Sequence, residues 1–123
     1  MLTQPYFFIR HDGRNQRIRM AEISHLEARK NYVRIVTLTG DYLALSTLRQ
    51  LLKLLPPDQF VQIHRGIIVN LEAVESFDRT LVYTKNENLP IGPAYASVLL
   101  SRIVLLNGPA TQTPGSTETP SPP

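Results

Sequence analysis

The fold is decided by the stretch HLEARKNYVRIVTLTGDYLALSTLRQLLKLLP, which runs from His25 to Pro56. In its first part, β-branched and aromatic residues alternate with polar ones between turn residues, which predicts three strands, at residues 23–28, 32–39 and 42–46. In its second part, leucines follow one another at i, i+3, i+4 and i+7, which is the spacing of one helix face. Ser46 or Thr47 can cap this helix, and Pro56 with Pro57 ends it. The stretch therefore predicts a cluster of antiparallel strands followed by an amphipathic helix.

Short strands are also predicted on both sides of this stretch. Upstream, residues 6–10 and 17–20 flank HDGRNQ, whose Asp12-Gly13 pair tolerates positive φ and predicts a hairpin turn. Downstream, further strands are expected at residues 60–64, 67–70, 75–78 and 81–84. A closing helix is expected from Pro93 or Ala94 to about Leu106, with an apolar side formed by Tyr95, Val98, Leu99, Ile103 and Leu106. The predicted fold class is mostly β, with short antiparallel sheets and two short helices.

Composition indicates one soluble globular domain. The chain has 123 residues, 42% of them hydrophobic, and no Cys, which removes disulfides, thiolate zinc sites and cysteine nucleophiles. No apolar run is long enough to span a membrane, and the first ten residues lack a secretory pattern, so we expect a cytoplasmic protein without a membrane partner. Residues 1–107 are expected to form the domain. Residues 108–123, rich in Pro, Thr and Ser, are expected to be a disordered tail.

Positive charge is concentrated in one part of the chain. Thirteen Lys and Arg residues face ten Asp and Glu residues overall, but residues 10–34 alone hold seven basic and three acidic residues. Such a local excess is what a binding surface for a polyanion carries. An uneven, solvated surface is the competing interpretation, and charge alone does not decide between the two.

The sequence offers little of the chemistry that an enzyme needs. His11, His25 and His64 are widely separated, with no partner at the spacing of common metal motifs. There is no glycine-rich phosphate loop, no nucleophile elbow, and no carboxylate pair that stands out from ordinary surface charge. We therefore predict no catalytic residues, no cofactor and no metal site, although side chains distant in sequence can still converge in space.

Three segments in order resemble the LytTR family of bacterial DNA-binding domains, over nearly all of residues 6–106. They are the stretch quoted above, DQFVQIHRGIIVNLEAVESFD at residues 58–78, and a strand at 89–91 that runs into the terminal helix. The resemblance implies a transcription regulator that binds double-stranded DNA, inserting loops and strand ends into successive major grooves. Family members usually act as output domains of response regulators, so this chain resembles a standalone member. Promoter sites with direct repeats and a homodimer on DNA would fit the family.

Two polar turns are the predicted DNA contacts. In the first, Arg29 and Lys30 suit phosphates, Asn31 can bond an adenine edge, and Tyr32 suits the backbone or a base. A solvated turn is the alternative. Arg34 shares a strand face with Tyr32, while Val33 and Ile35 are expected in the core.

The second turn interrupts two apolar strands with His64, Arg65 and Gly66. The Arg65 guanidinium can form bidentate hydrogen bonds with guanine or with a phosphate, and Gly66 would let DNA approach the backbone. His64 is equally compatible with a structural hydrogen bond. Asn70 is expected to cap or turn the segment that follows it.

The chain departs from the family pattern just before the final helix. Family members commonly carry a Ser-Arg or double-Arg cluster there, whereas Gly92, Pro93 and Ala94 carry no cation, and Gly66 replaces a small polar residue. These departures keep open an alternative function, a LytTR-like protein-protein interaction module that has lost DNA reading.

Overall fold

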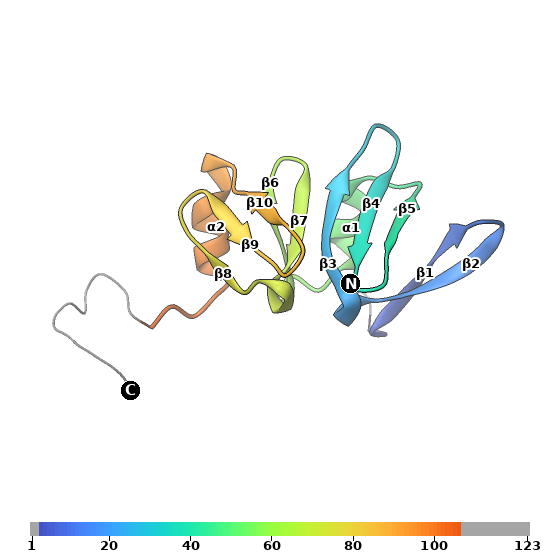
Figure 1. Ribbon diagram of the computed structural model, residues 1–123, viewed down its shortest axis with the longest axis horizontal. Helices are drawn as coiled ribbons and strands as arrows, with labels where there is room; N and C mark the ends of the chain where they lie inside the picture. The colour runs from blue at the N-terminus through green and yellow to red at the C-terminus, as the bar shows by residue number, and fades with distance from the viewer. Residues whose placement is uncertain (1–2, 107–123) are drawn as a thin grey trace, which may run out of the picture.

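The computed structural model describes residues 3–106, so the predicted tail at 108–123 lies outside the described residues. Three antiparallel sheets follow one another along the long axis of the molecule (Figure 1). The first contains β1 (Tyr6–His11) and β2 (Arg14–Arg19). The second has the order β5-β4-β3-β7-β6, and the third the order β10-β9-β8. The predicted fold class, mostly β with two short α-helices, is confirmed.

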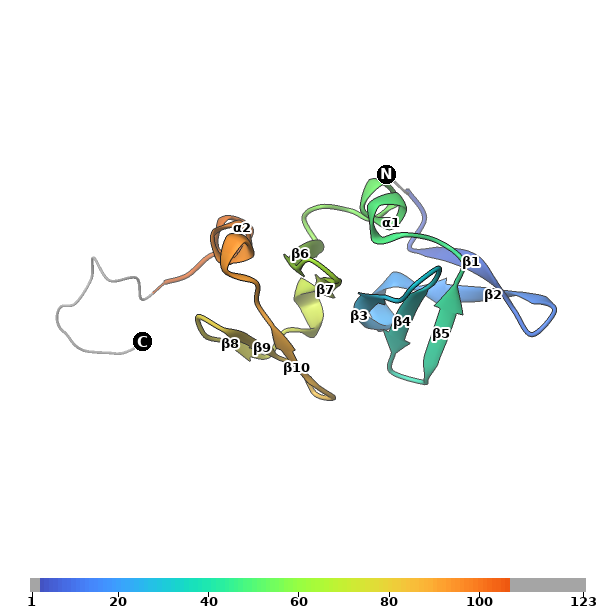
Figure 2. The same ribbon diagram turned by 90° about the horizontal axis from the view of Figure 1, so that it is seen from above.

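The five-stranded sheet is the middle layer (Figure 2). It is built from β3 (Ile23–Ala28), β4 (Val33–Thr37), β5 (Asp41–Ala44), β6 (Phe60–His64) and β7 (Ile67–Asn70). The third sheet is built from β8 (Ser76–Phe77), β9 (Leu81–Tyr83) and β10 (Asn88–Pro90). The helices are α1 (Leu48–Leu54) and α2 (Ala96–Ser101), with 3-10 turns at η1 (Met20–Glu22), η2 (Leu71–Ala73) and η3 (Pro93–Tyr95).

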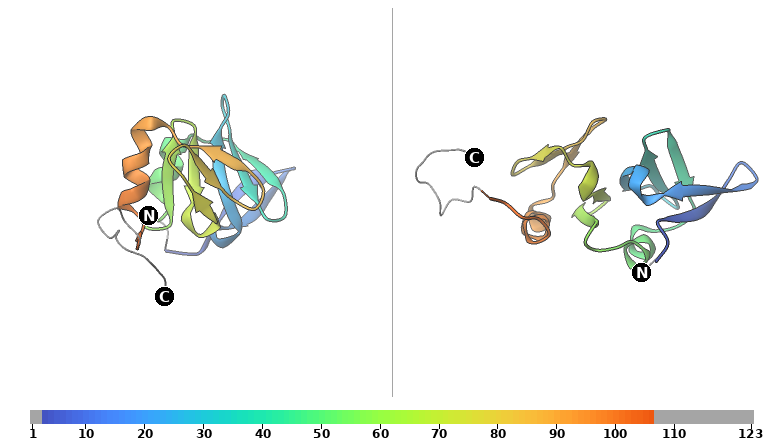
Figure 3. Two further views of the ribbon diagram at one scale, coloured as in Figure 1. Left: turned by 60° about the vertical axis from the view of Figure 1, so that its left-hand side comes forward. Right: turned by 90° about the horizontal axis from the view of Figure 1, so that it is seen from below.

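Each face of the middle sheet covers its own core. Side chains alternate between the two faces of a strand, so Val33 and Ile35 of β4 share one face and are fully buried there, as predicted. On that face they pack with the β1–β2 hairpin and α1. The opposite face, through Val61, Ile63 and Val69, packs against the third sheet and α2. Figure 3 shows α2 alongside β6.

Several local predictions are confirmed by backbone detail. Asp12 and Gly13 both have positive φ, 52° and 74°, and form the two-residue turn of the first hairpin. Thr47 caps α1 in a capping box with Gln50, whose backbone N–H it accepts at 3.1 Å. Asn70 accepts a hydrogen bond from the Glu72 backbone and donates to the backbone oxygen of Ile23, so it turns the following segment as expected.

The closing helix is shorter than the sequence predicts. It begins as the 3-10 turn η3 and ends at Ser101 rather than near Leu106. The Ser101 hydroxyl donates to the Val98 carbonyl, and residues after it leave the helix. From Arg102 to Leu106 no residue is fully buried: Ile103 is half-buried, whereas Val104 is 88% exposed and Leu106 is 80% exposed. Apolar residues at helical spacing continue to Leu106, but the core against which a longer helix would pack ends before them.

Candidate nucleic-acid interface

Three connections meet along one edge of the molecule. They are the β3–β4 turn, the β6–β7 turn and the β10–η3 connection, which all lie at the upper edge in Figure 1. The backbone N–H of Ala28 donates to the Gly66 carbonyl at 2.9 Å, and the N–H of Gly92 donates to the Ile63 carbonyl at 2.8 Å. These two hydrogen bonds join the first connection to the second and the second to the third. We call this surface the turn edge.

The β3–β4 turn presents polar side chains to solvent. The backbone N–H of Arg29 donates to the Tyr32 carbonyl at 2.8 Å, which closes the turn. Arg29, Lys30 and Asn31 are exposed, and Tyr32 is 45% exposed. Nη2 of Arg29 lies 3.2 Å from Oε1 of Glu27. Within residues 3–106, no carboxylate lies within 4.0 Å of the Lys30 amine, so its charge is available to a ligand.

The β6–β7 turn is held by its own polar groups. The N–H of Gly66 donates to Nδ1 of His64 at 3.1 Å, and the Gln62 amide donates to the Arg65 carbonyl at 3.2 Å. The Arg65 side chain is exposed, with no carboxylate partner in the part of the chain that the structure describes. A Cβ at position 66 would meet Ala28 Cβ at 3.8 Å, an ordinary contact. Packing within the protein therefore does not require glycine there.

The β10–η3 connection forms part of the turn edge but adds no charged side chain to it. A Cβ at Gly92 would lie 3.0 Å from Cδ2 of Tyr95, so the glycine lets this ring close over the connection. Pro93 and Ala94 are exposed and carry no cation. The available cations of the turn edge are therefore contributed by the other two connections.

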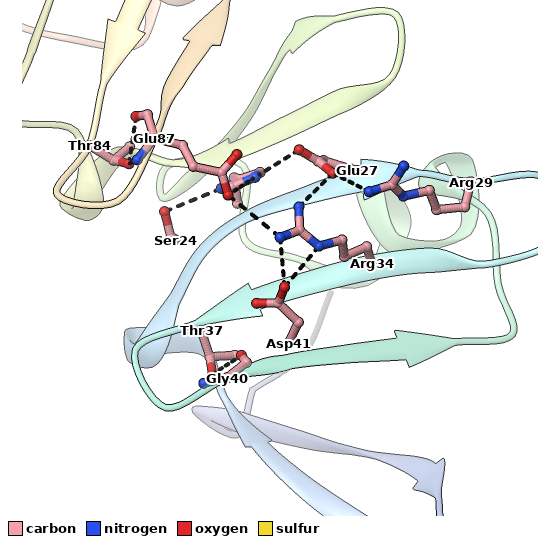
Figure 4. Close-up of polar contacts among 10 residues, drawn as sticks. Ser24, Glu27, Arg29, Arg34, Thr37, Gly40, Asp41, Thr84 and Glu87 are labelled. Atoms are coloured by element: carbon pink, nitrogen blue, oxygen red, sulfur yellow. Dashed lines mark hydrogen bonds and ion pairs between the residues drawn. The ribbon is translucent and has the colours of Figure 1, made fainter.

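Unlike Lys30 and Arg65, Arg34 is paired with carboxylates, and it shares Oε1 of Glu27 with Arg29. Its guanidinium donates to Glu27 at 2.8 Å and to Asp41 at 2.6 and 2.9 Å, and it lies 3.6 Å from a carboxylate oxygen of Glu87 (Figure 4). Burial alone would raise the pKa of Glu27, but the hydrogen bonds from Arg34 and His25 outweigh it and lower that pKa. The hydrogen bond to Glu27 in turn raises the pKa of Arg34.

His25 has partners that the sequence analysis did not find. The ring is fully buried, with Nε2 3.1 Å from Glu27 and 3.9 Å from Glu87. We call Glu27, Arg34, Asp41, Glu87 and His25 the ion-pair network. Residues two apart on a strand share one face, so the spacing of His25 and Glu27 in the sequence could have predicted their contact. Glu87 comes from the β9–β10 turn, and no local pattern in the sequence indicates that it reaches β3.

The structure thus brings together seven of the eight predicted contact residues. Arg29, Lys30, Asn31 and Tyr32 lie on one turn and His64, Arg65 and Gly66 on the next, joined through the hydrogen bond between Ala28 and Gly66. Arg34 joins the ion-pair network instead. No helix within residues 3–106 has the length and apolarity needed to cross a membrane.

Comparisons with known proteins agree with this fold. The structure is similar to the LytTr DNA-binding domain of a protein from Bacillus cereus described as a methyl-accepting/DNA response regulator. The two are 21% identical with a TM-score of 0.72, and the match covers 80% of this chain and 96% of the other. No curated protein matches the chain. The model of the LytTr DNA-binding domain family, a family of DNA-binding domains rather than enzymes, matches residues 13–103. Because this match covers well over half of the sequence, the chain belongs to the LytTr DNA-binding domain family.

Proposed function

We propose that this protein regulates transcription by binding specific double-stranded DNA sites, which it reads in the major groove through the turn edge. One observation carries the proposal. Two turns from different strand pairs are joined by the hydrogen bond between Ala28 and Gly66, and each presents a cation that no carboxylate of residues 3–106 neutralises, Lys30 on one and Arg65 on the other. Membership of a DNA-binding family supports the same partner.

The residues of the two turns have different proposed roles. Arg65 bonds O6 and N7 of a guanine with its fork, and Asn31 bonds an adenine edge, so these residues select the sequence. Arg29 and Lys30 bind phosphates and set the position of the protein on the duplex, and the Tyr32 ring and hydroxyl contact the backbone beside them. His64 holds the Gly66 backbone through Nδ1, and Gly66 lets the duplex approach the turn closely.

Arg34 is a positioning residue in this proposal. Because Glu27 and Asp41 already accept its hydrogen bonds, its fork is not free for DNA. Arg34 instead fixes Glu27, which also contacts His25 and, on the neighbouring turn, Arg29. The biological setting that we propose is promoter DNA in the bacterial cytoplasm, with two copies on a direct repeat.

The test compares two variants on selected DNA. A randomised duplex pool is enriched on the purified protein, and the enriched site and a scrambled duplex are then titrated by fluorescence anisotropy over a range of salt. Arg65→Ala should lose about 1–3 kcal/mol of preference for the enriched site. Lys30→Ala should weaken both duplexes alike and lower the salt slope by about 0.9.

Arg49→Ala is the matched control, since it removes one exposed cation from α1, outside the turn edge. It should leave the preference unchanged. If all three variants behave alike, the turn edge is not the reading surface.

A second candidate function is protein binding. The absence of any cation at Gly92, Pro93 and Ala94, where family members carry arginines, favours a fold that has given up DNA reading. A wild-type protein that enriches no sequence and shows no salt-dependent binding would support this alternative over the first.

A further inference from the structure

A second cationic surface lies on the β1–β2 hairpin, away from the turn edge. The antiparallel register pairs Tyr6 with Arg19, Phe8 with Arg17 and Arg10 with Asn15. Since side chains alternate along a strand, these six residues share one face, which we call the hairpin outer face. The other face carries Phe7, Ile9 and Ile18, which pack into the core with α1. The hairpin is therefore anchored from one side and open on the other.

Aromatic rings orient the central arginine of this face. The Arg17 guanidinium carbon lies 5.0 Å from the Tyr6 ring centre and 5.6 Å from that of Phe8. The two rings meet edge to face, 5.9 Å apart at 87°. A guanidinium stacked on a ring keeps its N–H donors free at the rim, and it loses less freedom when an anion binds. Phe8 is 52% exposed, which is costly for a phenyl ring that serves only the fold.

The arginines of the hairpin are not neutralised. Within residues 3–106, no carboxylate lies within 4.0 Å of the guanidinium of Arg10, Arg14, Arg17 or Arg19. Asp12, the one acidic residue of the hairpin, lies in its turn, 3.4 Å from His11. Arg34 shows the opposite case, since two carboxylates accept its hydrogen bonds. The hairpin outer face thus presents three free guanidinium groups and no acidic side chain.

The hairpin lies next to β5, the edge strand of the middle sheet. It lies beyond β5 at one end of the long axis, whereas the β3–β4 and β6–β7 turns lie at the upper edge in Figure 1 (Figures 1 and 2). The match to the family model begins at residue 13, so β1 precedes the matched residues. A ligand that follows the long axis past the β3–β4 turn leaves the molecule at the hairpin.

We propose that the hairpin outer face binds the phosphate backbone of DNA that flanks the site read by the turn edge. This inference rests on the proposed function, because the flanking DNA is a continuation of the same duplex. The chemistry favours phosphate, since guanidinium forks match its oxygens. Arg17 and Arg19 stand two residues apart on β2, about 6.6 Å, so they bind separate phosphates of the backbone. An acidic protein surface is the competing partner, and the test separates the two.

The test measures how binding depends on duplex length. The enriched site is made as a minimal duplex and as a duplex extended by about one helical turn on each side. Both are titrated over a range of salt with wild type and with the double variant Arg17→Gln/Arg19→Gln. On the extended duplex, the double variant should lower the salt slope by up to about 1.8, which is about 0.9 for each lost phosphate contact. On the minimal duplex, it should match the wild type.

Two further variants control for charge and for folding. Arg49→Gln/Lys53→Gln removes the same charge from exposed positions of α1 and should change the slope on the two duplexes equally little. Arg17→Lys keeps the charge but loses the stacked fork, so it should retain most of the slope and weaken binding to the extended duplex severalfold. Thermal unfolding of each variant checks that the hairpin still folds.

The outcomes separate this inference from the proposed function. If wild type binds the minimal duplex in an Arg65-dependent way, yet the hairpin variant behaves as wild type on the extended one, the inference is overturned and an acidic protein surface becomes the better partner. Equal losses for the hairpin and α1 variants also overturn it, since they would show general charge attraction only. If wild type binds neither duplex, the proposed function fails and the inference fails with it.

Discussion

The turn edge and the ion-pair network hold the same kinds of residue a few positions apart, yet they use them in opposite ways. Lys30 and Arg65 face solvent with no carboxylate of residues 3–106 beside them. Arg34, four residues after Lys30, is enclosed by Glu27 and Asp41. A cation counted in the sequence is therefore available to a ligand only where no carboxylate pairs with it. What decides is whether a strand pairing brings a carboxylate opposite the cation, as it brings Glu27 opposite Arg34.

Removing the network's arginine should give the largest effect on stability. Arg34→Ala leaves Glu27 and Asp41 without their main hydrogen-bond donor in a partly buried site, which should cost about 2 kcal/mol of unfolding free energy. Urea denaturation measures it. Arg65→Ala is the matched control from the turn edge and should change stability by no more than about 0.5 kcal/mol. Equal losses in both variants would erase the distinction between the two regions.

The network should also make the protein sensitive to acid. The folded-state pKa of Glu27 lies below its ordinary value of 4.5, so the stabilisation is present above that pH and is lost as the pH falls through the lowered pKa. Unfolding free energy measured from pH 7 down to pH 3 should therefore decrease less in Glu27→Gln than in wild type. Parallel curves for the two proteins would show that Glu27 contributes nothing to acid unfolding.

Substitution of Gly66 in the turn edge should change stability and DNA binding in opposite directions. Gly66 has room for a Cβ, and its φ does not require glycine, so Gly66→Ala should stabilise the free protein by about 0.4–1 kcal/mol. The same methyl group should weaken binding to the enriched duplex if the backbone approaches DNA there. Thermal unfolding and anisotropy on one sample measure both. Stronger binding by Gly66→Ala would place the duplex elsewhere.

The smallest expected effect is a gain at the uncharged part of the turn edge. Ala94 is exposed on η3, so Ala94→Arg can add a cation without disturbing the core. The salt slope on DNA should rise by about 0.9, one phosphate contact. Ala94→Gln, with a long neutral side chain, should leave it unchanged. The same slope for both variants would show that this connection does not face the duplex.

The strands could be predicted from the sequence because alternation and turn residues act locally. The predicted ranges 23–28, 60–64 and 67–70 agree with β3, β6 and β7 to the residue, and Thr47 caps α1 as its position suggests. The length of α2 could not be predicted, since apolar spacing continues past Ser101 where nothing remains to cover it. Arg34 and Glu87 show the same limit, because their partners are set by how strands and turns meet in space.

The hydrogen bond between Ala28 and Gly66 also sets a distance. It joins two turns through backbone atoms, so rotation of the side chains does not change the distance between the backbones at Lys30 and Arg65. Under the proposed function, the spacing of the two turns is fixed. The duplex must therefore adjust its groove width and curvature to contact both Lys30 and Arg65. Base steps that bend at little cost would be favoured even where no side chain touches them. Part of the sequence preference would lie in the stiffness of the DNA.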